Sequence, residues 1–559
     1  MEFRRDRRRR ASGSGVRALA WLSAFGLGLW VGAFRYSTLA AQPIAHAHPI
    51  PVVPAELLNR PLPLRANIGR AHDGVSTVSK EAQAYYDQGL AYLHGYVWIE
   101  AARSFNQALR LDPRLAIADA ELSIAYTELN QPALARSALE RARGLAPQVS
   151  EHDRLHIAAR AAQAEAEAAP GDQVKLAAYR KALDGALLKA PQDEELLILR
   201  GVAESTDPAD RGQGSVLSSI PSYEKALRLG SVAAHHYLTH ALENSGRIAD
   251  ALPHADAYAR AAPAIPHALH MSGHVLRRLG RIDEAVGSFE AAERAEAEYL
   301  RAEKIPPEYD WHGEHNLDLL GSSYRYLGQM TKAERELKTA FDLPSSLIVQ
   351  MYNKRAWPEY LIARGRTDDA LAAARVLTAH SVTLVRAVGH IEAGHARLAS
   401  GNMQAAAEES NAALMELRSA SGGQSLIAPA LQELQGQYLM RAGQRDRAHA
   451  MLEDLVKKIR ALPGPDNWVQ ALFTMESIGQ TAREAGDWIF AEWIGRQMVE
   501  HDPNYAGGHY ALALAADQRG DVSNAQGEFA AAAHLWSKAD PSLPELARIR
   551  ARIPNFGVR

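Results

Sequence analysis

Residues 89–113 read GLAYLHGYVWIEAARSFNQALRLDP, and this stretch decides the fold. It is rich in alanine and leucine, which favours helix over strand. The small residues Gly89 and Ala101 let two antiparallel helices touch, while Phe105 is large enough to fill the space beside them. Pro113 ends the second helix because proline has no N–H to donate. The stretch therefore predicts one unit of two packed helices.

The same spacing recurs along the chain. The next unit places Tyr126, Ala135, Ala142 and Pro147 at corresponding positions. A period of about 34 residues with small residues at positions eight and twenty is the tetratricopeptide pattern, and the chain resembles that family. Later units are marked by Ala186 and Pro191, Ala251 and Pro263, Gly273 and Phe289, Gly321 and Ala333, Ala370, Gly394 and Ala406, Gly436 and Ala448, Gly479 and Pro503, and Ala525 and Phe529.

The resemblance implies an all-α, right-handed superhelical solenoid of antiparallel helix pairs. We expect about twelve repeats over residues 79–540, followed by a C-terminal cap and tail over 541–559. Glycine- and proline-rich breaks at 421–425 and 463–466 are where the solenoid would subdivide, if it subdivides.

The N-terminus predicts export. Six arginines between Arg4 and Arg10 precede an apolar run from Ala18 to Phe34, a pattern typical of a signal peptide or a signal anchor over residues 1–41. The protein is therefore expected to be periplasmic or anchored by this segment, with no other membrane contact. Six prolines between residues 43 and 66 predict an extended linker over 42–78.

Composition narrows the function classes. The chain has no cysteine, so thiolate chemistry and thiolate metal sites are excluded. The body that follows the basic N-terminus is acidic, which argues against nucleic-acid binding. Phosphate-binding loops, nucleophile elbows and the HExxH motif are all absent. These observations favour a non-enzymatic scaffold that binds a protein, peptide or small ligand in its concave groove.

Histidines supply the alternative hypothesis. Nine of the 22 histidines fall between His235 and His315. His236 and His240 are four residues apart, and the pair His270 and His274 repeats this spacing 34 residues later. Residues four apart share one face of a helix, and two such pairs on adjacent helices could hold Zn²⁺, Cu²⁺ or iron. Oxygen donors nearby in the sequence are Glu243, Asp310, Glu314 and Asp318.

The tetratricopeptide resemblance implies that these histidines line the groove. In its register His236 and His270 occupy position five, His240 and His274 occupy position nine, and His267 and His315 occupy position two. Three interpretations stay open: hydrogen-bonding residues in the seams between helices, a groove for a polar ligand, and a metal site at the four paired histidines. The predicted groove residues are His235, His236, His240, His267, His270, His274, His312, His315 and Asn316.

A narrower resemblance rests on the segment from Ser76 to Phe105 and on HHYLTHALE and HMSGHVLRRLGR. These stretches are similar to a group of exported bacterial tetratricopeptide proteins. In that group the first segment carries a histidine where this chain has Gly95, Tyr96, Val97 and Trp98.

Overall fold

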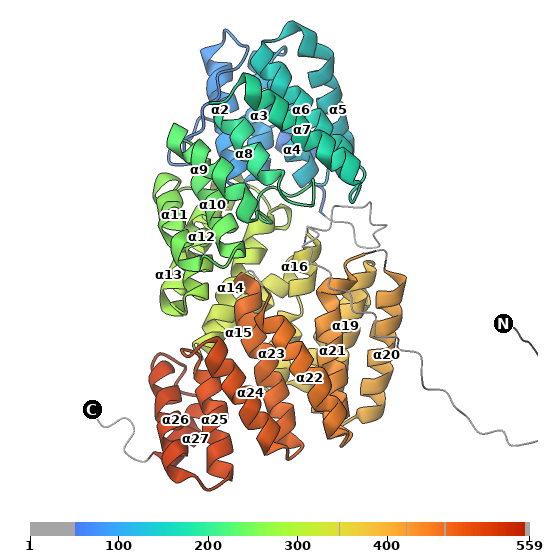
Figure 1. Ribbon diagram of the computed structural model, residues 1–559, viewed down its shortest axis with the longest axis vertical. Coiled ribbons are helices and arrows are strands. Elements are labelled where there is room, and N and C mark those ends of the chain that lie inside the picture. The colour runs from blue at the N-terminus through green and yellow to red at the C-terminus, as the bar shows by residue number, and fades with distance from the viewer. Residues whose placement is uncertain (1–50, 346, 421, 463–464, 554–559) are drawn as a thin grey trace, which may run out of the picture. The chain divides into compact units, whose positions relative to one another are not determined.

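The computed structural model describes residues 51–345, 347–420, 422–462 and 465–553. Within these ranges the chain forms helices and no strand, so the predicted all-α class of antiparallel helix pairs is confirmed (Figure 1). None of the described helices is both long and apolar enough to cross a membrane. The predicted export signal at 1–41 lies outside the described residues.

The segment before the first repeat differs from the predicted extended linker. Residues 51–78 contain a short helix and pack onto α2 and α3, with Val53, Leu58, Leu62 and Ile68 buried. The prolines do prevent a long helix here, but the apolar residues between them supply enough packing surface to fix the segment.

Twelve helix pairs follow within the described residues, with the short helix α16 between the seventh and eighth pairs. The first four pairs run from α2 to α9. The N-terminal helices are α1 (Ala55–Leu58), α2 (Lys80–His94), α3 (Trp98–Leu111), α4 (Ala116–Glu128), α5 (Pro132–Leu145), α6 (Glu151–Glu167), α7 (Gln173–Lys189), α8 (Glu194–Val202) and α9 (Ile220–Leu229), with 3₁₀ turns η1 (Ala146–Gln148) and η2 (Leu217–Ser219).

The central pairs carry the histidine-rich stretch. Each helix from α10 to α14 packs against the next one, as Figure 1 shows for α10 to α13. The central helices are α10 (Ala233–Asn244), α11 (Ile248–Ala261), α12 (Pro266–Arg278), α13 (Ile282–Glu303), α14 (Trp311–Tyr326), α15 (Met330–Asp342), α16 (Ile348–Asn353), α17 (Ala356–Ala363) and α18 (Thr367–Thr378), with η3 (Pro307–Tyr309).

The C-terminal pairs continue the array, and α23 also packs back against α12 and α14. One buried apolar cluster runs from Leu276 to Ala511, so the core crosses both predicted break points at 421–425 and 463–466. The remaining helices are α19 (Thr383–Ala399), α20 (Met403–Ser419), α21 (Gln424–Arg441), α22 (Arg445–Arg460), α23 (Pro465–Glu484), α24 (Trp488–His501), α25 (Ala506–Gln518), α26 (Val522–Leu535) and α27 (Pro544–Arg552).

Glycines at position eight let the two helices of a pair touch. A Cβ atom on Gly273 would lie 2.5 Å from the Phe289 ring, and one on Gly89 would lie 2.4 Å from the Phe105 ring. Both distances are shorter than any ordinary van der Waals contact, so only glycine fits. The expected role of these small residues is confirmed.

The turn inside a pair uses a residue with left-handed backbone. The last eight pairs all place a glycine there, for example Gly280 with φ +69°. The first two pairs instead have Tyr96 (φ +58°) and Asn130 (φ +56°). A tyrosine in this conformation is strained by about 1–2 kcal/mol. Such strain persists only where contacts of the residue hold it in place, and these contacts of Tyr96 are described below.

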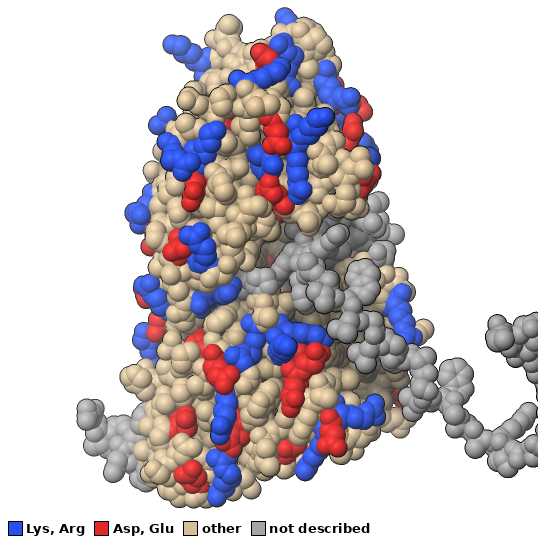
Figure 2. All heavy atoms as spheres, viewed as in Figure 1, with Lys and Arg blue, Asp and Glu red and all other residues tan. Residues whose placement is uncertain are grey.

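The surface carries both signs of charge. On the face drawn in Figure 2, lysine and arginine side chains alternate with aspartate and glutamate side chains.

Candidate metal centre

The histidines converge inside the array. Helices α10, α12 and α14 are the first helices of three successive pairs, and each contributes histidines to one buried region. His236, His267 and His270 are at most 2% exposed. Of the six histidines in the two groups described below, His315 is the one that is only partly buried.

Three histidines form the first group, which we call trio A: His236, His240 and His267. The Nε2 atom of His236 lies 3.0 Å from Nε2 of His267 and 3.1 Å from Nε2 of His240. His236 and His240 share one face of α10, and α12 brings His267 alongside them. One ring nitrogen from each residue thus faces a common point.

The ring orientation of His236 is fixed from outside the trio. Its Nδ1 atom lies 2.8 Å from the carbonyl oxygen of His94, at the end of α2. Because a carbonyl only accepts hydrogen bonds, Nδ1 carries the proton and donates it. In the neutral ring Nε2 is therefore left with a lone pair that points at the other two histidines, which is how a metal-binding imidazole is held.

The second group, trio B, consists of His270, His274 and His315. The Nε2 atoms of His270 and His274 are 2.6 Å apart, which is short for two uncharged ring nitrogens that share one proton. Ring centroids of His315 lie 4.9 Å from His270 and 5.7 Å from His274. Helix α12 supplies two of the three rings and α14 the third.

Asn316 orients His270 in the way that the His94 carbonyl orients His236. Its Nδ2 atom donates to the carbonyl oxygen of Phe289 (3.0 Å), which fixes the direction of the amide. Its Oδ1 atom then accepts from Nδ1 of His270 at 2.7 Å. Both trios therefore contain one imidazole whose proton is held on the outer nitrogen and whose lone pair faces inward.

His312 lies between the trios. Its ring centroid is 5.2 Å from His267 of trio A and 5.0 Å from His270 of trio B. Nδ1 of His312 is hydrogen-bonded to the buried carboxylate of Glu296, and its Nε2 has no partner among the described residues. A seventh oriented imidazole is thus available where the two groups meet.

The imidazoles are neutral. Burial, followed by repulsion between neighbouring rings, lowers the pKa of His236, His267 and His270 well below the usual value. Burial also lowers the pKa to about 3 for His240 and His274 and to about 4 for His312 and His315. A metal ion needs the unprotonated ring, so these groups require no deprotonation to bind one.

Several buried nitrogens in this region lack hydrogen bonds. Within the described residues, Nδ1 of His267, Nδ1 of His274 and Nε2 of His312 have none. Buried polar atoms are almost always paired in native proteins, and an exception calls for an ion, a water or a catalytic role.

An aromatic shell covers the two trios. The Tyr96 ring lies 4.6 Å from His236 and 4.9 Å from His267, while Tyr258 stacks on His236 at 5.1 Å. Trp311 stacks on His315 at 5.9 Å and donates from Nε1 to the carbonyl oxygen of Tyr96. The strained turn at Tyr96 therefore serves to hold an aromatic ring over trio A.

The structure refines the sequence-based assignments. The prediction placed the four paired histidines together, but they divide between two groups, each completed by a residue predicted only for the groove: His267 in trio A and His315 in trio B. The other groove residues take supporting or outside positions. His235 pairs with half-buried His254 (Nδ1 to Nδ1, 2.9 Å), outside both trios.

Most of the predicted groove residues lie in the interior of the array. Apart from His235 and His315, the predicted groove histidines and Asn316 are buried, because the Tyr96 turn, Trp311 and helix α23 pack over them. Whether any of them binds a ligand stays a prediction.

Of the four predicted oxygen donors, Glu243 forms a close contact with a histidine of the trios. Glu243 Oε2 lies 3.6 Å from Nδ1 of His274. Glu314 instead forms an ion pair with Lys354 (2.9 Å), and Asp310 caps the N-terminus of α14 by accepting from the backbone N–H of Gly313. These two carboxylates therefore already have an ion-pair or hydrogen-bond partner other than a trio histidine.

Comparison with known proteins adds family evidence for one repeat. The family model described as "Tetratricopeptide repeat" matches residues 266–299, which hold α12 and most of α13. No curated protein matches the chain.

Solved structures that are similar to the chain include the following three. A tetratricopeptide repeat protein from Parabacteroides merdae is 16% identical, covers 49% of this chain and 98% of its own, and has a TM-score of 0.33. Yeast Tom70 is 12% identical over 85% of this chain and 90% of its own, with a TM-score of 0.27. Cut9–Hcn1 of the APC/C is 13% identical, covers 85% of this chain and 96% of its own, and has a TM-score of 0.29.

The matched repeat contains His267, His270 and His274, so part of each histidine trio lies on a recognised unit. This chain is an all-α helical-repeat protein that carries a tetratricopeptide repeat at residues 266–299.

Proposed function

We propose that this protein binds a pair of transition-metal ions in the interior of its helical array, one in trio A and one in trio B. The observation that carries the proposal is the convergence of ring nitrogens: the three that each trio offers lie within 4.8 Å of one another. The outward hydrogen bonds of His236 and His270 support it, since they leave inward lone pairs.

Copper is the metal that this ligand set favours. Each trio offers only imidazole nitrogens, which suit copper and zinc, and copper(II) binds a given nitrogen site more tightly than the other first-row divalent ions. Three neutral ligands also leave a coordination position open, as catalytic metal sites do. His312, with an unpartnered Nε2 between the trios, is placed to complete either one.

Helix pairs of the tetratricopeptide type commonly serve as scaffolds for protein partners. In this proposal the scaffold has a second role, because three successive first helices position the metal ligands. The basic and apolar N-terminal segment adds the prediction of export, which cell fractionation of the full chain would test by locating it in the membrane or the periplasm.

Metal analysis tests the proposal. The full chain, purified without a histidine tag, is stripped with chelator and loaded with Cu²⁺ before its metal content is measured. We expect His240→Ala to lower copper content by one ion per chain, His274→Ala by one, and the double variant by two.

His254→Ala is the matched control, because His254 lies on the neighbouring helix α11 and outside both trios. Copper content that is equal in His254→Ala and in the double variant, with all proteins folded by circular dichroism, contradicts the proposal. X-ray absorption spectroscopy of the copper-loaded wild-type chain gives a second measurement that needs no variant. A copper coordination shell without imidazole scattering would also contradict the proposal.

A further inference from the structure

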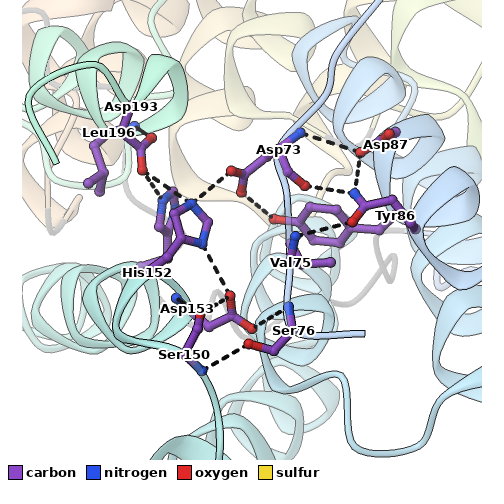
Figure 3. A network of polar contacts seen from close by, with 12 residues as sticks. Asp73, Val75, Ser76, Tyr86, Asp87, Ser150, His152, Asp153, Asp193 and Leu196 are labelled. Atoms are coloured by element: carbon purple, nitrogen blue, oxygen red, sulfur yellow. Dashed lines mark hydrogen bonds and ion pairs between the residues drawn. The ribbon is translucent and has the colours of Figure 1, made fainter. Parts of the chain in front are cut away.

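A second cluster of histidines and carboxylates lies outside the two trios, among the N-terminal helices. It consists of Asp73, His152, His156 and Asp193, whose ligand atoms all lie within 4.8 Å of one another. Asp73 belongs to the segment before α2, the histidines lie on α6, and Asp193 directly precedes α8. Figure 3 shows His152 between the carboxylates of Asp73, Asp153 and Asp193.

The distances in this cluster match those between ligands of one small ion. Nε2 of His152 lies 2.8 Å from Asp73 Oδ1 and 3.2 Å from Asp193 Oδ2, and Nε2 of His156 lies 2.9 Å from the same Asp193 oxygen. In a tetrahedral zinc site with bonds of about 2.0 Å, neighbouring ligand atoms are about 3.3 Å apart.

Local structure holds each ligand in place. Asp193 caps α8 with Oδ1, which accepts from the backbone N–H of Leu196, so that Oδ2 remains for the cluster. His152 and His156 are four apart on α6 and therefore face the same side. Asp73 is steadied by Gln83, whose Nε2 donates to the Asp73 carbonyl oxygen at 2.7 Å.

An outer carboxylate orients His152. Nδ1 of His152 lies 3.1 Å from Oδ1 of Asp153, and Oδ2 of Asp153 accepts from the backbone N–H of Ser76. A carboxylate on the outer nitrogen of a histidine is the usual second layer of a zinc site, since it directs the other nitrogen at the metal.

The geometry points to a zinc site formed by Asp73, His152, His156 and Asp193, which ties the segment before α2 to α6 and α8. Two carboxylates balance the charge of one divalent cation, and two imidazoles with two carboxylate oxygens suit zinc. The alternative is a network of two protonated histidines, which would place two positive rings 4.6 Å apart between centroids. One bound cation replaces that repulsion.

Zinc would have a structural role here. The ligands come from three segments separated by about 80 and 40 residues, so a bound ion closes two long loops at the N-terminal end of the array. The His152 side chain is 26% exposed, which gives an ion a route from solvent. The site shares no residue with trios A and B, so zinc binding at this cluster can be measured separately from copper binding at the trios.

Anomalous diffraction locates the ion directly. Crystals of the unmodified full chain grown with ZnCl₂, measured on both sides of the zinc absorption edge, are expected to show a peak enclosed by the four residues. An anomalous zinc peak at the trios with none at this cluster, or no zinc peak anywhere in these crystals, overturns the inference.

Variants give the second readout. We expect Asp73→Asn to lower zinc affinity at least tenfold and to remove one zinc ion per chain, while copper loading of the trios is unchanged. His72→Gln is the matched control, because His72 is adjacent but pairs with Asp87 instead. In the His240→Ala, His274→Ala double variant this zinc ion should remain. Zinc content that is the same in Asp73→Asn and His72→Gln indicates a protonated ion-pair network and contradicts the zinc site.

Discussion

Asn316 decides which nitrogen of His270 carries the proton. Replacing it with leucine removes the acceptor at 2.7 Å from His270 Nδ1, so the ring is no longer held with its lone pair toward trio B. We expect Asn316→Leu to weaken copper binding at trio B by about 10- to 100-fold, the usual cost of losing an outer hydrogen bond. Competition titration against a copper chelator measures it.

Asn316→Asp is the informative companion because a carboxylate still accepts from Nδ1 of His270. Its copper affinity should stay close to that of the wild type, and trio A should be unaffected in both variants. Equal weakening by the leucine and aspartate substitutions would show that Asn316 acts through packing alone.

Tyr96 occupies a turn position where glycine is the common choice, and its ring covers His236 and His267. Tyr96→Gly should relieve the backbone but expose trio A to solvent. We expect chelator to remove the trio A ion several times faster from this variant, as followed by stopped-flow absorbance. Asn130→Gly changes the same turn position in the second pair and should leave the removal rate unchanged.

Sequence reasoning at the residue scale found the paired histidines but not their grouping. Spacing of four puts His236 with His240 and His270 with His274 on common faces, and this much follows from helix geometry. Which histidine completes each group depends on the rotation and offset of α12 and α14 against their neighbours. His267 joins the pair on α10, the first helix of the preceding helix pair, and no pattern within one repeat encodes that choice.

Helices α12 and α13 pack against each other through a close contact between Gly273 and the Phe289 ring. Gly273→Ala would put a Cβ atom 2.5 Å from the Phe289 ring, and that ring lies 5.0 Å from His270. We expect a loss of about 1–3 kcal/mol in unfolding free energy, typical of overpacking. Because α12 carries histidines of both trios, the proposed copper affinity should fall at both.

Gly436→Ala is the matched control at the element scale. Its Cβ atom would lie 2.4 Å from Leu452, at the same kind of contact between α21 and α22, but far along the chain from the histidines. It should destabilise the chain by a similar amount in urea unfolding and leave copper affinity unchanged. A loss of copper affinity in both variants would mean that general destabilisation, not the position of α12, controls binding.

The elements themselves were largely predictable, for a physical reason. Each pair is a local structure whose small, large and helix-ending residues recur at fixed spacing, so the sequence of one unit carries its own fold. The segment 51–78 was misjudged because its prolines signal the absence of helix, whereas its buried leucines and valine are visible only once α2 and α3 are there to cover them.

At the scale of the whole molecule, contacts distant in sequence could not be read from a repeat. Helix α23 packs against α12 and α14, which lie about 200 and about 150 residues earlier in the chain, and helps to bury trio B. A 34-residue register describes how each unit meets the next one. The register does not describe contacts between two units that are far apart in the chain and meet across the array.

Stability as a function of pH reports on the C-terminal half of the array. Glu433 is 8% exposed, and burial, together with the neighbouring Glu359, raises its pKa to about 8. Glu392, 1% exposed, has its pKa raised in the same way, and Arg355 opposes both shifts. A carboxyl whose folded pKa is raised stabilises the fold while protonated. That stabilisation is complete below the unfolded pKa of about 4.5 and is lost as the pH rises toward 8.

We therefore expect the unfolding free energy of the metal-free chain to fall between pH 5 and pH 8, with Glu433 contributing up to about 4 kcal/mol over this window at about 1.4 kcal/mol per pH unit. Glu433→Gln keeps the hydrogen-bonding shape without the charge, so it should flatten the profile and raise stability at pH 8. Urea unfolding in the presence of chelator at both pH values measures this. Glu408→Gln, on an exposed carboxylate of α20, should leave the slope as it is. A Glu433→Gln profile parallel to that of the wild type would show that the Glu433 carboxylate is already ionised in the fold at pH 5, compensated by Arg355.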